Sequence, residues 1–125
     1  MFYEDLSLFQ YTRRDVAPNL LNVGWLDASH PYAKGDVPEK FLDHLFDLCR
    51  SQVNRTRGWQ ECQFCEKANL GVRVVKDETE LVLGSAEIRV PGEGGLIYAS
   101  PNLIYHYVAA HGYRPPDAFI EAVMK

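Results

Sequence analysis

The sequence is poor in cysteine and has no excess of positive charge, and each deficit excludes a class of protein. Three cysteines among 125 residues are an odd number and too few for the disulfide framework of a small secreted domain. Thirteen lysines and arginines stand against seventeen acidic residues, a net charge of −4. A protein that binds nucleic acid through electrostatics needs a clearly basic face. We therefore expect neither a disulfide scaffold nor a nucleic-acid partner.

Long hydrophobic runs are also lacking. No apolar stretch approaches the roughly 18 residues of a membrane-spanning helix. The first residues, Met1-Phe-Tyr-Glu-Asp-Leu6, carry acid where a signal peptide has a basic region followed by an apolar run. These features predict a cytoplasmic protein with no membrane contact.

What is present is an ordinary globular composition, with 46% apolar and 24% charged residues. The length fits a single domain over residues 1–125. A first helix is expected from an N-cap at Asp36 to about Gln52, because Phe41, Leu45 and Cys49 recur on one helical face.

The middle of the chain is rich in β-forming residues. Residues 71–99 read as one antiparallel meander, with a hairpin turn at 76–79, a second turn or a bulge at Gly84-Ser85, and a loop at 91–95. An earlier short strand is expected at 22–26. The predicted fold class is α+β, a small antiparallel meander packed by about three helices.

Two helices should close the chain. Ser100 and Pro101 have the residue types of an N-cap and a first helical position, and Gly112 suits the residue after the helix end. The second of these helices should open at 115–117 and place Phe119, Ile120 and Val123 on one apolar face.

The sharpest chemical signal is the C-x₂-C pair Cys62 and Cys65, a spacing that lets two thiolates hold one tetrahedral zinc ion. A single pair is half a site. Cys49 and His106 are the candidates for the other half, so the predicted metal ligands are Cys62, Cys65, Cys49 and His106, with zinc in a structural role. Free thiols or a redox-active pair are the alternatives.

The two histidines near the C-terminus are harder to place. His106 and His111 are five residues apart, which puts them about 140° apart around a helix. Both should join one site only if the helix broke between them. His111 lies in the middle of an apolar stripe and is expected to be a buried core residue, with His106 at the edge of the stripe.

Asp27 and His30 could also form a carboxylate–histidine pair, although a polar loop is the simpler interpretation.

Four segments carry a resemblance: Val23-Gly-Trp-Leu-Asp27, Gly58-Trp-Gln-Glu-Cys-Gln-Phe-Cys65, Glu87-Ile-Arg-Val90, and Tyr98 through Pro115, which is the most distinctive. The chain resembles a family of small uncharacterised bacterial proteins with no established activity. The resemblance implies a bacterial origin. Small acidic α+β proteins of this kind are often immunity proteins or partner-binding proteins of toxin systems, an analogy at the level of the fold class alone.

No complete catalytic constellation is apparent, so no catalytic residue is assigned. The leading hypothesis is a non-enzymatic protein-binding module with a structural zinc site, whose partner could be a basic toxin domain. The acids Asp77, Glu78 and Glu80 gather at one predicted turn and favour such a partner. The alternative is a small metal- or thiol-dependent enzyme that uses Cys62, Cys65 and His106.

Overall fold

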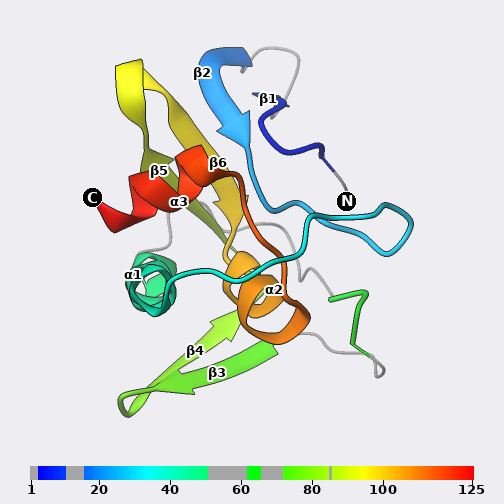
Figure 1. The fold of residues 1–125 in the computed structure, drawn as a ribbon, viewed down its shortest axis with the longest axis vertical. Helices are drawn as coiled ribbons and strands as arrows, with labels where there is room; N and C mark the ends of the chain where they lie inside the picture. The colour runs from blue at the N-terminus through cyan, green and yellow to red at the C-terminus, as the bar shows by residue number, and fades with distance from the viewer. Residues whose placement is uncertain (1–2, 11–15, 51–61, 66–71, 85) are drawn as a thin grey trace.

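The computed structural model describes residues 3–10, 16–50, 62–65, 72–84 and 86–125. Within these ranges it has three α-helices, one short 3₁₀ helix and six strands (Figure 1). In chain order the elements are β1 (Leu8–Gln10), β2 (Val16–Asn22), α1 (Glu39–Arg50), β3 (Val72–Lys76), β4 (Thr79–Leu83), β5 (Glu87–Pro91), η1 (Glu93–Gly95), β6 (Ile97–Pro101), α2 (Ile104–His111) and α3 (Asp117–Met124).

The strands form two separate sheets. One has four strands in the order β1-β2-β6-β5, in which β2 and β6 are parallel and the other pairs antiparallel. The other is the antiparallel hairpin β3-β4. Figure 1 shows the four-stranded sheet and the hairpin toward opposite ends of the molecule, with α1 and α2 between them. The predicted α+β class is confirmed.

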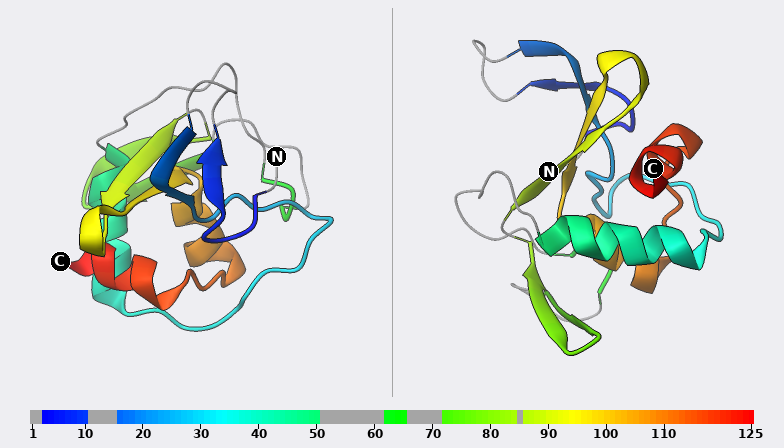
Figure 2. Two further views of the ribbon diagram at one scale, coloured as in Figure 1. Left: turned by 90° about the horizontal axis from the view of Figure 1, so that it is seen from above. Right: turned by 90° about the vertical axis from the view of Figure 1, so that its left-hand side faces the viewer.

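Helix α1 packs against both α2 and α3, and α1 and α3 also pack against strands. Phe41, Leu45, Phe46 and Cys49 of α1 are buried at helical spacing, as predicted. The Phe41 ring lies edge-on to Phe119 of α3, with 6.2 Å between ring centres. Figure 2 shows α1 and α3 on the same side of the long β5-β6 pair. Helix α2 packs against α1 and lies beneath the four-stranded sheet in Figure 1.

The prediction of a single meander over residues 71–99 was wrong, because β4 and β5 belong to different sheets. Gly84 takes a φ of +115° between them, a backbone conformation open to glycine, and the chain leaves the hairpin there. The hairpin itself is confirmed, with a tighter turn than expected. Asp77 and Glu78 are its two central residues, and both have positive φ, as in a type I′ turn.

Two element boundaries also differ from expectation. The predicted strand at 22–26 is wrong, since β2 ends at Asn22 and Gly24 follows with a φ of +81°. The helix expected from Pro101 begins at Ile104 instead, because Ser100 and Pro101 extend β6 and pair with β5.

Other boundaries agree. α2 ends at His111, and Gly112 follows in the left-handed conformation, as expected. The predicted end of the first helix, at Gln52, lies outside the described residues. Among the described helices, none has the length and apolarity needed to cross a membrane.

Candidate metal centre

Two segments far apart in sequence supply the candidate site. Residues 62–65 form a short turn, and α2 supplies one histidine from its first turn and another from its last residue. The sulfur atoms of Cys62 and Cys65 and the imidazole nitrogens of His106 and His111 all lie within 4.8 Å of one another. Among the described residues, this is the one group of three or more potential metal ligands.

The distances between these donor atoms can be compared with those of a zinc site. Cys62 Sγ lies 3.3 Å from His111 Nε2, and Cys65 Sγ lies 3.2 Å from His106 Nε2 and 3.5 Å from His111 Nε2. The two Nε2 atoms are 3.1 Å apart. With Zn–S near 2.3 Å and Zn–N near 2.05 Å, a tetrahedron has edges of about 3.6 Å between S and N and about 3.3 Å between two N atoms. Four of the six distances between donor atoms are therefore close to the edges of such a tetrahedron, and all six are within 4.8 Å.

Two opposing effects act on the sulfur of Cys62 in the turn at 62–65. The backbone N–H groups of Phe64 and Cys65 donate hydrogen bonds to this sulfur and favour its charged form. Burial acts more strongly in the opposite direction and raises the pKa of Cys62 to about 11. Without a metal, Cys62 is a neutral thiol, and an incoming cation must displace its proton.

Both imidazoles are suited to act as ligands. Burial lowers the pKa of His106, and His111 beside it lowers that pKa further. Burial also lowers the pKa of His111. Each ring is therefore neutral at physiological pH, which is the form that binds a metal. Both reach the site through Nε2.

His111 was expected in the core and outside the site, and this prediction was wrong. It is half-buried, and its Nε2 lies in the cluster although α2 is unbroken from Ile104 to His111. The expected angle of about 140° describes directions at the backbone. An imidazole carries Nε2 several ångströms outward, so the two rings can turn toward each other. Their centres are 4.8 Å apart and their planes nearly perpendicular.

Cys49, named as a third ligand, is not in this group. It lies on the buried face of α1, where its thiol donates a hydrogen bond to the carbonyl oxygen of Asn102 at 3.5 Å. Burial raises its pKa to about 12. Its surroundings fit the other interpretation of this residue, a small core thiol. The structure thus brings together Cys62, Cys65 and His106 and supplies His111 as the fourth donor.

Aromatic rings pack around the cluster. The Phe64 ring lies between Tyr32, Tyr107 and His111, with centre-to-centre distances of 5.0, 5.8 and 5.6 Å. The Tyr32 hydroxyl donates a hydrogen bond to the carbonyl oxygen of His111 at 2.9 Å. These contacts fix the end of α2 relative to the turn at 62–65.

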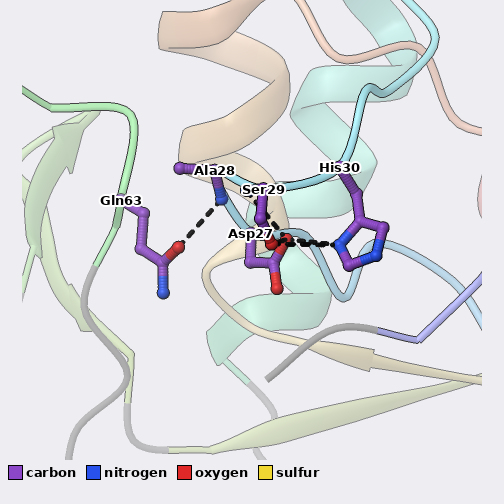
Figure 3. Close-up of polar contacts among 5 residues, drawn as sticks. All are labelled: Asp27, Ala28, Ser29, His30 and Gln63. Atoms are coloured by element: carbon purple, nitrogen blue, oxygen red, sulfur yellow. Dashed lines mark hydrogen bonds and ion pairs between the residues drawn. The ribbon is translucent and has the colours of Figure 1, made fainter.

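The loop at 27–30 lies against the same turn. The Ala28 N–H donates to the side-chain oxygen of Gln63 at 2.8 Å, as Figure 3 shows. In this loop Asp27 Oδ1 lies 2.7 Å from His30 Nδ1, so the carboxylate–histidine pair does form. The hydrogen bond with His30 is the main cause that lowers the pKa of Asp27.

This loop does not have the geometry of a catalytic triad. Ser29 Oγ contacts Asp27 Oδ1 at 3.0 Å and the Nδ1 atom of His30 at 3.3 Å. In a triad the serine contacts the ring nitrogen opposite the one that faces the carboxylate. Here serine and carboxylate share one nitrogen (Figure 3), so these contacts order a polar loop instead.

Fold and site together define a small α+β domain with a Cys₂His₂ cluster that can hold a metal ion. The chain belongs to the family described as domain of unknown function DUF7919, which matches residues 1–124. No curated protein and no solved structure matched the chain.

Proposed function

We propose that this protein is a small zinc-binding module in which Cys62, Cys65, His106 and His111 hold one Zn²⁺ ion in a structural site. The observation that carries the proposal is the spacing of the four donor atoms, at 3.1 to 3.5 Å for the four pairs in contact. Two thiolates with two imidazoles form a donor set typical of structural zinc. Carboxylates, which magnesium and calcium prefer, are not part of the cluster.

A structural role follows from the number of protein ligands. A catalytic zinc ion keeps one coordination position for water or substrate, with three positions filled by the protein. Here four side chains converge, and a tetrahedral ion bound by all of them has no open position. The arrangement therefore favours the binding module over the metal-dependent enzyme considered from the sequence.

The proposed ion would join segments that are distant along the chain. Cys65 and His106 are 41 residues apart in sequence. The turn at 62–65 contacts the loop at 27–32 through Gln63 and Phe64, so that loop is held indirectly. Zinc would stabilise a part of the molecule that has little regular secondary structure of its own.

Elemental analysis of protein purified without added metal tests the proposal directly. We expect one zinc ion per chain. Substitution with Co²⁺ should give the absorption bands of a tetrahedral ion with thiolate ligands. The double variant Cys62→Ser/Cys65→Ser should lose both the metal and these bands.

A matched control separates loss of a ligand from loss of any cysteine. Cys49→Ala removes the third thiol of the chain, which lies outside the cluster, and should retain one zinc ion. Protein that contains no zinc, does not take up Zn²⁺ or Co²⁺, and has Cys62 and Cys65 freely titratable would refute the proposal.

We propose further that the module binds a protein partner, of which a basic toxin domain in a bacterial immunity system is one example. The feature that supports it is the β3-β4 hairpin, which projects from the body of the molecule (Figure 1). Asp77 and Glu78 are exposed at its turn, and the side chain of Val75 beside them is 67% exposed. Glu80, also expected to contribute, instead pairs with Arg73 at 2.8 Å.

Charge reversal tests this second proposal. Asp77→Lys/Glu78→Lys should weaken capture of the partner from source cells at low salt, with a smaller difference at high salt. Glu121→Lys, at an exposed position of α3, is the control and should behave like the wild type. A partner set that neither the hairpin variant nor salt changes would refute an electrostatic contact at this turn.

A further inference from the structure

The two cysteines of the cluster differ in exposure, and this difference bears on how the site reacts. Cys62 is buried, with 1% of its surface exposed, whereas Cys65 is partly exposed. Their sulfur atoms lie within 4.8 Å of each other. A solvent-borne oxidant therefore meets Cys65 first, and Cys62 stands close behind it.

We propose that the metal centre is also a redox-sensitive latch, in which a peroxide oxidises Cys62 and Cys65 to a disulfide and expels the zinc ion. This inference rests on the proposed zinc site and adds its regulation. The geometry that carries it is one partly exposed cysteine, one buried cysteine whose sulfur lies within 4.8 Å of the first, and a third cysteine outside the cluster.

The chemistry balances in two steps. The sulfur of Cys65 attacks one oxygen of hydrogen peroxide, the O–O bond breaks, and Cys65 becomes a sulfenic acid while hydroxide leaves and takes up a proton as water. The sulfur of Cys62 then attacks the sulfur of Cys65, an S–S bond forms, and a second hydroxide leaves as water. The two sulfurs lose two electrons in total and the peroxide gains two, with two protons consumed.

The position of Cys49 excludes it from this step. It lies on the buried face of α1 and donates its S–H to the carbonyl oxygen of Asn102. It is fully buried, so a peroxide in solvent does not reach it. The disulfide should therefore form within the C-x₂-C turn, and Cys49 should stay a thiol.

Loss of the ion would act on the neighbouring segments. A disulfide between Cys62 and Cys65 links the two ends of the turn to each other. Without the zinc ion, no coordination bonds join the turn to His106 and His111. The contacts that depend on this connection are those of Gln63 with Ala28 and of Phe64 with Tyr32. Oxidation should consequently loosen the loop at 27–32 as well as the turn.

The experiment starts from protein that carries one zinc ion per chain and adds hydrogen peroxide in steps. Released zinc is measured with a chromogenic chelator, and the protein is examined by mass spectrometry. We expect one zinc ion released for each Cys62–Cys65 disulfide, with a mass loss of two hydrogen atoms relative to the reduced, metal-free chain. Reduction with a thiol in the presence of Zn²⁺ should restore the original state.

Hydrogen exchange at the Ala28 amide reports on the loop. Before oxidation its N–H donates a hydrogen bond to the Gln63 side chain. Its exchange rate should increase by about tenfold or more after oxidation. The variant Cys49→Ala should release zinc and form the same disulfide as the wild type.

Three results would overturn the latch. Zinc retained while peroxide is consumed, zinc released with Cys65 over-oxidised and no disulfide, or a disulfide that includes Cys49 would each contradict the proposed step and leave the structural zinc site standing. Protein that never binds zinc would overturn the latch together with the proposed function, so the two failures are distinguishable.

Discussion

Removal of zinc should lower the free energy of unfolding by an amount set by the free zinc concentration. A zinc ion that binds only the folded state stabilises the chain by about 2.7 kcal/mol when the free zinc concentration is 100 times the dissociation constant. For 125 residues, an unfolding entropy of about 2.1 cal/mol/K per residue gives about 0.26 kcal/mol/K. The melting temperature in buffered zinc should therefore exceed that in chelator by about 10 °C.

The variant His111→Ala tests whether the fourth donor is needed. The variant leaves three of the four candidate ligands in place. In the wild type, His111 Nε2 is the atom that contacts both sulfurs and the other imidazole. We expect its melting temperature to show little dependence on zinc at the concentration that stabilises the wild type by about 10 °C. Calorimetry in chelator and in buffered zinc measures both proteins under the same conditions.

Cys49→Ala is the matched control, since its thiol is buried but lies outside the cluster. It should melt at a lower temperature than the wild type in both buffers and still gain about 10 °C from zinc. The reasoning fails if the wild type melts at one temperature in zinc and in chelator. It also fails if His111→Ala keeps the full gain.

Three other outcomes are expected. Between about pH 7 and 8 the dissociation constant for zinc should fall by at least about tenfold per pH unit. The ion displaces the proton of Cys62, whose pKa is near 11, whereas the two imidazoles, with pKa values lowered by burial, are already neutral there. Competition with a chelator at several pH values measures the slope, and a slope near zero would contradict the prediction. In metal-free native protein Cys49 should resist alkylation at pH 8, since burial raises its pKa to about 12, whereas Cys65 should react. Peptide mapping identifies the labelled cysteines, and rapid labelling of Cys49 would contradict the prediction. Gly24→Ala should lower the free energy of unfolding by about 1 to 3 kcal/mol, because φ is +81° there and a Cβ would lie 2.6 Å from Ile104 Cδ1. Urea denaturation measures this loss, and an unchanged midpoint would refute the contact.

Local patterns in the sequence were sufficient for the elements whose signals are local. The apolar spacing of α1 and α3 and the position of Gly112 after α2 were predicted correctly, because helix periodicity and the left-handed conformation of a terminal glycine depend on neighbours within a few residues. The β3-β4 hairpin was predicted for the same reason. The C-x₂-C spacing likewise marked Cys62 and Cys65, which lie in the one described group of residues that could hold a metal ion.

The other half of the candidate site, and the partition of the strands, were decided by the tertiary structure. The β propensity of a segment does not specify its partner, so the sequence could not separate β4 from β5 or pair β2 with β6 in parallel, with Leu20 opposite Ile97. For a similar reason the sequence placed Cys49 among the candidate ligands and His111 in the core, whereas His111 lies in the cluster and Cys49 does not. The direction of a residue around its helix limits where its side chain can point, but packing between α1, α2 and the turn at 62–65 determines which donor atoms meet.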